Sequence, residues 1–280
     1  MTEEHTPTQD IHSVVRQHYG KIAQDFQPSK SASCCGPANS DCCSSQTGDF
    51  VKLYDSPEAA GLPEEITGLS LGCGDPVTLA SLQPGQVVLD LGSGGGIDCF
   101  LAAQKVGLTG HVIGVDMTPA MLEKARANRA RLGAQNVEFR LGEIEHLPVA
   151  DNQADVIISN CVINLSPDKP QVFREAFRVL KPGGRLAVSD IVTDGPLPES
   201  IKSSLSAWAG CVAGALDVKD YTAGIEAAGF VDVSLIPVYF SPEMVDEATA
   251  QLEGSIDLGH ISPERLQKAV FSAKITAVKP

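Results

Sequence analysis

Thiols are the side chains of this 280-residue chain with the most chemistry to offer, because it contains eight cysteines. Five of them stand in loops of small residues: Cys34 and Cys35, Cys73, Cys161, and Cys211. The thiolate is the form of cysteine that binds metals and attacks electrophiles. These loops therefore predict sites for a soft metal, a metalloid or redox chemistry.

The remaining cysteines give weaker signals. Cys42-Cys43 is a second adjacent pair in the Ser-, Gly- and Pro-rich stretch 28–49. Zinc sites usually space their paired cysteines by two to four residues, so adjacent pairs do not favour zinc. Cys99 stands beside apolar residues in a predicted helix and reads as a small buried hydrophobe. Nothing resembles a secretion signal, so we expect reduced thiols in a soluble, cytoplasmic protein.

A glycine-rich loop supplies the second chemical signal. The apolar run Val87–Leu91 contains Asp90 and continues into Gly92, Gly94 and Gly96. The dinucleotide fingerprint fails here, because its third glycine position holds isoleucine. The pattern Asp-x-Gly-x-Gly-x-Gly instead resembles the first motif of Rossmann-like S-adenosylmethionine (SAM) methyltransferases. The alternative is a strand–helix turn that binds nothing.

Asp116 strengthens the SAM interpretation, because it ends the next predicted strand 20 positions after Gly96. A carboxylate there can accept hydrogen bonds from both ribose hydroxyls. Met117 can pack on the adenine, Glu143 can accept from the adenine amine, and the Ile144 backbone can meet the ring edge. The alternative for Glu143 is a solvated loop residue. The predicted SAM-binding residues are Asp90, Gly92, Ser93, Gly94, Asp116, Met117, Glu143, Ile144 and Asn160.

These residues need an α/β scaffold, since ligands of doubly wound sheets bind outside the carboxyl ends of the strands. We predict a Rossmann-like core with a mostly parallel sheet over residues 71–195. An N-terminal appendage, 1–70, contributes a helix and the cysteine-rich loop, and a smaller α+β region, 196–280, closes the chain. The expected strands are 87–91, 111–116, 137–141, 155–159, 185–188, 230–238 and 270–278. The expected longer helices are 11–24, 98–106, 119–132, 169–180, 199–209, 221–228 and 244–252.

Charge and composition exclude other classes. The formal net charge of -14 and the lack of any Lys/Arg cluster argue against nucleic acid and anionic membranes as partners. No apolar run reaches the length that spans a membrane. We therefore expect small-molecule partners.

Thiols at the rim of a SAM site suggest a thiophilic substrate. Trivalent arsenic fits, since three thiolates can replace its three hydroxyl groups and leave one lone pair. That lone pair carries no proton, so it can attack the SAM methyl group without a general base. Catalysis then reduces to aligning lone pair, methyl group and sulfonium.

The chain resembles the arsenite S-adenosylmethionine methyltransferase family over nearly its whole length. The matching segments are Tyr19-Gly20, Cys34-Cys35-Gly36, Leu71-Gly72-Cys73-Gly74, the Asp90–Gly96 loop, Ser159-Asn160-Cys161-Val162, and Trp208 to Leu216 around Cys211. The resemblance implies that Cys161 and Cys211 hold arsenic through every methylation, while Cys73 and either Cys34 or Cys35 assist with inorganic arsenite. It also implies a thiol reductant of the glutathione or thioredoxin type as co-substrate.

Two features depart from this pattern or lie outside it. Asp75 stands where we expect asparagine, and Cys42-Cys43 has no role that the family assigns. The competing hypotheses are a C- or O-methyltransferase of a small lipid or quinone and a non-catalytic arsenic-binding protein. Methyl transfer to arsenite as the only acceptor distinguishes the first, and SAM titration distinguishes the second.

Overall fold

The computed structural model describes residues 11–28, 61–69, 72, 74–195, 214–241 and 269–280. Cys99 and Cys161 lie within these ranges, and the other six cysteines lie outside them. The helices predicted at 199–209 and 244–252 also lie outside the described residues.

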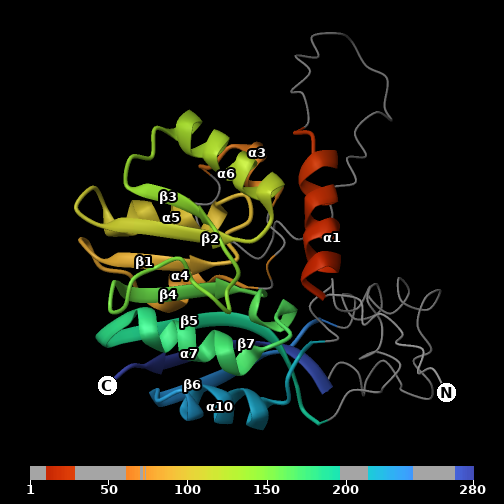
Figure 1. The fold of residues 1–280 in the computed structure, drawn as a ribbon, viewed down its shortest axis with the longest axis vertical. Coiled ribbons are helices and arrows are strands. Elements are labelled where there is room, and N and C mark those ends of the chain that lie inside the picture. The colour runs from red at the N-terminus through yellow and green to blue at the C-terminus, as the bar shows by residue number, and fades with distance from the viewer. Residues whose placement is uncertain (1–10, 29–60, 70–71, 73, 196–213, 242–268) are drawn as a thin grey trace, which may run out of the picture.

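Seven strands form one sheet in the order β3-β2-β1-β4-β5-β7-β6 (Figure 1). Neighbours from β3 to β5 run parallel, and β7 pairs antiparallel with both β5 and β6. This confirms the prediction of a mostly parallel, Rossmann-like sheet, which β6 and β7 extend. The strands are β1 (Val87–Leu91), β2 (His111–Asp116), β3 (Val137–Leu141), β4 (Ala154–Asn160), β5 (Leu180–Thr193), β6 (Val231–Val238) and β7 (Val270–Val278).

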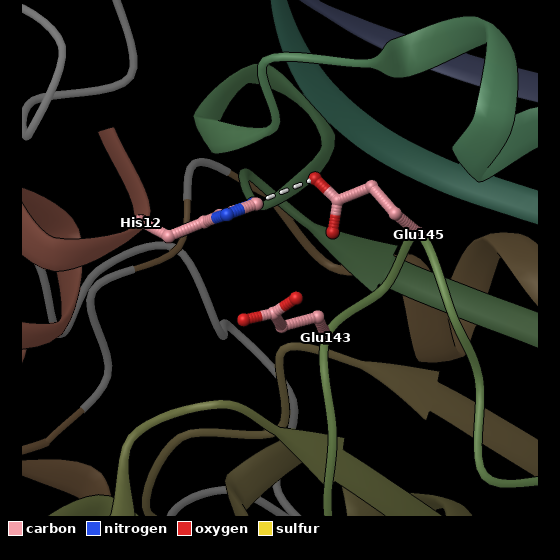
Figure 2. A group of neighbouring side chains, drawn as sticks. All are labelled: His12, Glu143 and Glu145. Carbon is pink, nitrogen blue, oxygen red and sulfur yellow. Dashed lines mark hydrogen bonds and ion pairs between the residues drawn. The ribbon is translucent and has the colours of Figure 1, made fainter. Parts of the chain in front are cut away.

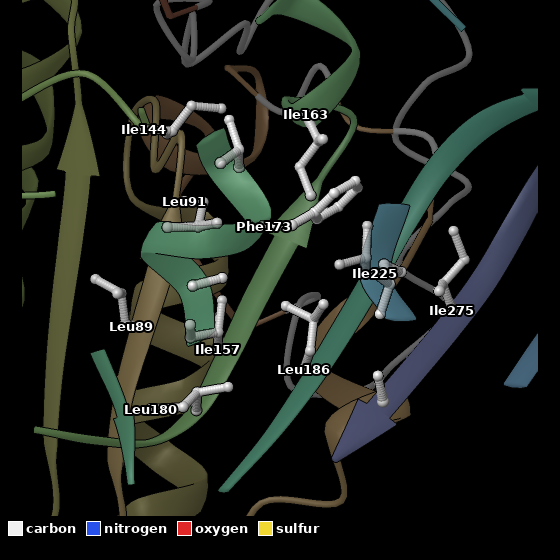
Figure 3. Close-up of a cluster of buried hydrophobic side chains, with 14 of the residues drawn as sticks. Leu89, Leu91, Ile144, Ile157, Ile163, Phe173, Leu180, Leu186, Ile225 and Ile275 are labelled. Atoms are coloured by element: carbon white, nitrogen blue, oxygen red, sulfur yellow. The ribbon is translucent and has the colours of Figure 1, made fainter. Parts of the chain in front are cut away.

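Helices cover both faces of the sheet because neighbouring strand residues point to opposite faces. Val88 of β1 packs with α3, α4, α5 and α6, whereas Leu89 and Leu91 pack with α7 and α10. Figure 3 shows the core on the face covered by α7 and α10, in which Phe173 and Ile225 pack against the strands. The helices are α1 (Ile11–Asp25), α3 (Glu64–Thr67), α4 (Pro76–Ala80), α5 (Ile97–Val106), α6 (Pro119–Leu132), α7 (Lys169–Val179) and α10 (Val218–Ala227), with the 3-10 turn η2 (Ile163–Leu165).

Strand β5 is longer than the sequence predicted. The run Lys181-Pro182-Gly183-Gly184 has the composition of a turn, yet it lies within β5. The register with β4 shifts there, from Ala154 opposite Leu180 to Val156 opposite Arg185. Lys279, just after β7, exchanges backbone hydrogen bonds with Gly183 and Gly184. Pairing with the end of the chain therefore absorbs the turn as a bulge.

Helix α1 stands beside the sheet at the carboxyl ends of the parallel strands (Figure 1). Its Val15 is 2% exposed and packs in a cluster with Cys161 and Leu165. The predicted apolar face of this helix is thus used for packing over the edge where ligands of such sheets bind. No helix in the described part of the chain is long and apolar enough to cross a membrane.

A buried carboxyl group connects the core sheet to α10. Asp190 of β5 is 0% exposed and accepts a hydrogen bond of 3.1 Å from the hydroxyl of Tyr221. The Ile191 backbone N–H also donates to it. Burial raises the pKa of Asp190 to about 7, and these hydrogen bonds oppose that rise.

This pKa predicts a pH dependence of stability. An unfolded aspartate has a pKa of about 3.9, so between about pH 4 and 7 the folded protein holds a proton that the unfolded chain releases. The free energy of unfolding should fall as pH rises through this window, by up to about 1.4 kcal/mol per pH unit from this group. Asp190→Asn has no such proton. Urea unfolding at pH 4.5 and pH 7 measures the free energy of unfolding of both proteins. The value for the variant should rise relative to that of the wild type as the pH is raised to 7. An equal difference between the two proteins at both pH values would contradict the assignment.

Candidate active site

The glycine-rich turn after β1 shapes one wall of the site. The backbone N–H groups of Gly92 and Ser93 both donate to the Val115 carbonyl, at 2.8 and 3.0 Å. Gly92 has φ +69°, and a Cβ there would lie 2.4 Å from the Val162 side chain. Gly94 has φ +50°, and a Cβ there would meet nothing within 4 Å. The first glycine thus permits close packing, and the second leaves the backbone open to a ligand.

Asp116 at the end of β2 holds this turn in place. One carboxylate oxygen accepts from the Gly94 N–H at 2.9 Å, and the other accepts from the Thr118 N–H at 2.7 Å. Burial raises the pKa of Asp116, and both N–H groups counteract that rise. Each carboxylate oxygen has capacity for a further hydrogen bond. The carboxylate can therefore receive ribose hydroxyls while it fixes the loop.

A pocket opens between this turn and the loops that follow β3 and β4. Seven of the nine predicted cofactor-binding residues line it: Gly92, Ser93, Gly94, Asp116, Met117, Ile144 and Asn160. The start of α5 follows the glycine-rich turn, so free N–H groups and the positive end of the helix dipole face the same region. The arrangement suits a ligand with a sugar and an anionic group.

Asp90 and Glu143 are not among the residues that line this pocket. Asp90 is 1% exposed and accepts from the Cys99 thiol, with 3.2 Å between oxygen and sulfur. Burial and the neighbouring Asp98 raise the pKa of Asp90. The Glu143 carboxylate instead accepts from Arg16 of α1 at 3.1 Å. Asp90 therefore supports the turn from within the core, and the adenine contact of Glu143 stays a prediction.

Cys161 follows β4 directly and stands between Asn160 and Val162, which both line the pocket. Its φ of +58° lies in the left-handed region, which is uncommon for a residue with a side chain and typical of functional positions. The Cys161 N–H donates to the Ser189 carbonyl at 2.8 Å, and the residue is 5% exposed. Cys161 is disulfide-bonded, and Cys99 is free.

Asn160 holds a second segment against this rim. Its amide donates to the Gly74 carbonyl at 2.8 Å and accepts from the Gly74 N–H at 3.2 Å. A Cβ at Gly72 would lie 2.3 Å from the same amide. The two glycines that flank Cys73 in the sequence are therefore packed against the residue that precedes Cys161.

Comparison with known proteins agrees with this geometry. A family model described as a methyltransferase domain matches residues 82–229. An arsenite methyltransferase of Halobacterium salinarum is 45% identical, over 97% of this chain and 67% of that protein. The arsenite methyltransferase of Mus musculus is 35% identical, over 88% of this chain and 63% of that protein.

This chain belongs to the arsenite methyltransferase family. Its fold also matches the crystal structure of an arsenic(III) S-adenosylmethionine methyltransferase from Chlamydomonas reinhardtii. That match has a TM-score of 0.64 and 35% identity, and it covers 82% of this chain and 73% of the other. The chain spans about two thirds of the length of the curated arsenite methyltransferases it matches.

Sequence pattern assigned no binding role to several residues that line the pocket of this arsenite methyltransferase family member. Asp98 is 6% exposed, lines the pocket and accepts from the Asn160 amide at 3.2 Å. His12 and Tyr19 of α1 also line it, as does Glu145. The seven-residue spacing of His12 and Tyr19 places both on one helical face, which was the available signal. What that face contacts depends on the tertiary fold.

The role of Asp116 can be tested by SAM binding. Losing a hydrogen bond to a charged group costs about 1.5–3 kcal/mol, so Asp116→Ala should weaken SAM binding roughly tenfold to a hundredfold. Asp151→Ala is the matched control, because that side chain is 70% exposed and pairs with Arg178. Isothermal titration calorimetry with SAM measures both variants. Unaltered affinity in Asp116→Ala would remove Asp116 from the SAM site.

Proposed function

We propose that this chain transfers methyl groups from SAM to trivalent arsenic held by cysteine thiolates, and so serves arsenic biotransformation and detoxification. The observation that carries the proposal is the position of Cys161. It follows β4, the direct neighbour of β1, and β1 leads into the glycine-rich wall of the pocket. A soft ligand therefore stands beside a site suited to SAM. The names of the relatives support arsenite as the first substrate.

Substrate binding is an exchange of thiols for hydroxyl groups on arsenic. Each thiol that bonds to arsenic passes its proton to the departing hydroxide, which leaves as water. Arsenite offers three such positions, and methylarsonous acid offers two because a methyl group occupies the third. Cys161 and Cys211 hold arsenic in both cases, and Cys73 with Cys34 or Cys35 completes the capture of arsenite.

Methyl transfer then needs alignment more than proton transfer. The arsenic lone pair forms the arsenic–carbon bond while the sulfonium–carbon bond breaks, and that electron pair stays on sulfur to give S-adenosylhomocysteine. The carboxylates of Asp98 and Asp116 line the pocket and favour a cationic methyl donor. No general base is required, because the attacking lone pair carries no proton. Positioning of the two reacting atoms is the main contribution of the protein.

Thiol redox state governs this chemistry. Methylation oxidises arsenic formally to the pentavalent state, and two thiolates can return the two electrons by forming a disulfide. The disulfide at Cys161 is in keeping with this step, because it is the oxidised form that the cycle requires of this residue. A thiol reductant of the glutathione or thioredoxin type would reset the pair. This cycle requires a reducing compartment, which is the reason to propose the cytoplasm.

A series of cysteine variants tests the division of roles. Cys161→Ser or Cys211→Ser should abolish methylation of both arsenite and methylarsonous acid, because a hydroxyl is a hard and weak ligand for arsenic. Cys73→Ser should lose activity on arsenite and keep activity on methylarsonous acid. Cys34→Ser combined with Cys35→Ser should behave like Cys73→Ser. Chromatographic speciation of the arsenic products measures all four outcomes.

Cys99→Ser is the matched control in this series. The Cys99 side chain is buried and donates to Asp90, and serine can make the same donation. It should keep both activities and lose only stability. SAM affinity, measured in every variant, separates a lost arsenic ligand from a damaged fold. A Cys161→Ser protein that still methylates methylarsonous acid would overturn the proposed geometry.

The redox step gives a separate prediction. Protein oxidised to the Cys161 disulfide should not methylate arsenite, since the thiolate is the ligand, and a dithiol should restore activity. Mass spectrometry of alkylated protein follows the disulfide while product is measured. Several turnovers per protein molecule without any reductant would contradict the cycle.

A further inference from the structure

His12, Glu143 and Glu145 form a cluster at the edge of the pocket, and the proposed methyl transfer gives it no role beyond the predicted adenine contact of Glu143. Nε2 of His12 in α1 lies 3.0 Å from Oε1 of Glu145, which follows β3 in the chain. One nitrogen or oxygen from each of the three side chains lies within 4.8 Å of the others. Figure 2 shows the three side chains facing one another from two separate segments.

We propose that this cluster binds a divalent first-row transition-metal cation, with one imidazole and two carboxylates as ligands. Bonds of about 2.1 Å from such a cation to nitrogen and oxygen place neighbouring ligand atoms about 3 Å apart. His12 and Glu145 already have this separation. The Glu143 side chain is 35% exposed and can rotate through the remaining distance.

The charges at the cluster favour a cation over a simple ion pair. Two carboxylates that face one point repel each other unless positive charge lies between them. Glu145 has only 7% of its side chain exposed, and its carboxylate contacts His12 and Ser166. Arg16 donates to one oxygen of Glu143 at 3.1 Å. A divalent cation bound through the second Glu143 oxygen would place positive charge between the two carboxylates.

The position of the cluster indicates what the cation does. His12 belongs to α1, which packs over Cys161 through Val15, whereas both glutamates belong to the loop between β3 and β4. His12 and Glu145 also line the pocket. A cation bound by both segments would hold α1 in place beside the pocket and over Cys161. The site is thus a positioning device, separate from the thiols that hold arsenic.

Binding of Mn²⁺ to the full reduced chain tests the proposal without any substrate. Mn²⁺ is the appropriate probe because it prefers carboxylates to thiolates, so the eight cysteines compete little. Electron paramagnetic resonance of free Mn²⁺ should reveal one saturable site in this cluster. His12→Ala and Glu143→Gln should each weaken it at least tenfold, since even the loss of a group behind a ligand costs 10- to 100-fold. Both side chains are partly exposed, so both variants should fold.

Glu138→Gln is the matched control. Glu138 pairs with His111 at 3.3 Å in a His–carboxylate pair elsewhere on the surface, outside the three-residue cluster. This variant should bind Mn²⁺ like the wild type. Absence of saturable binding by the wild type, or wild-type binding in both cluster variants, would overturn the site. Equal weakening by Glu138→Gln would do the same.

Hydrogen exchange measured by mass spectrometry tests the fastening of α1. Mn²⁺ should slow exchange in peptides from α1 and from the loop at residues 142–148 in the wild type, and should not do so in His12→Ala. Unchanged exchange in α1 on saturation would overturn this role. Because neither experiment contains SAM or arsenite, failure here leaves the proposed methyl transfer untouched.

Discussion

The register of the parallel strands is the constraint on which the whole site depends. Leu91 of β1 lies opposite Val115 of β2 and Ser159 of β4, so the residues after all three strands emerge at one edge. Gly92 and Ser93 donate to the Val115 carbonyl across this register, and Asp116 accepts from Gly94 in return. A slip of one residue would turn every side chain of a strand to the opposite face. The buried sheet faces forbid that slip, and they thereby fix the geometry of the pocket.

Much of this core follows from local sequence pattern. The bounds of β1, β2, β3 and β7 match the predicted ranges, because β-branched and apolar residues follow one another or alternate with polar ones along each strand. The same reasoning placed the glycine turn and Asp116 together, since both follow strands of one parallel sheet. Local pattern failed at Lys181–Gly184, where pairing with the chain end carries β5 through a turn-like sequence. The favourable pairing there is nonlocal, so no window of neighbouring residues contains it.

The side chains around the pocket could be predicted only in part, for the same reason. The spacing of Asp116 after the glycine loop is a local signal, and Asp116 lines the pocket. Whether Glu143 faces the pocket or α1 depends on Arg16, which stands 127 positions away in the chain. The role of Asp90 likewise depends on Cys99, which lies in the first turn of α5 and donates to Asp90. Motif reasoning thus brought these residues to one edge of the sheet and left the directions of their side chains open.

Hard and soft ligand atoms of the protein lie at different places along the carboxyl-terminal edge of the sheet. Carboxylates at Asp98 and Asp116 line the pocket proposed for the sulfonium donor, and the sulfur ligand proposed at Cys161 follows β4, between two residues of the pocket wall. The cluster of His12, Glu143 and Glu145 offers oxygen and nitrogen, for which trivalent arsenic has little affinity compared with thiolates. A cation there and arsenic at the thiols therefore need not compete. Since α1 touches both places, it is the element through which occupancy of one could stabilise the other.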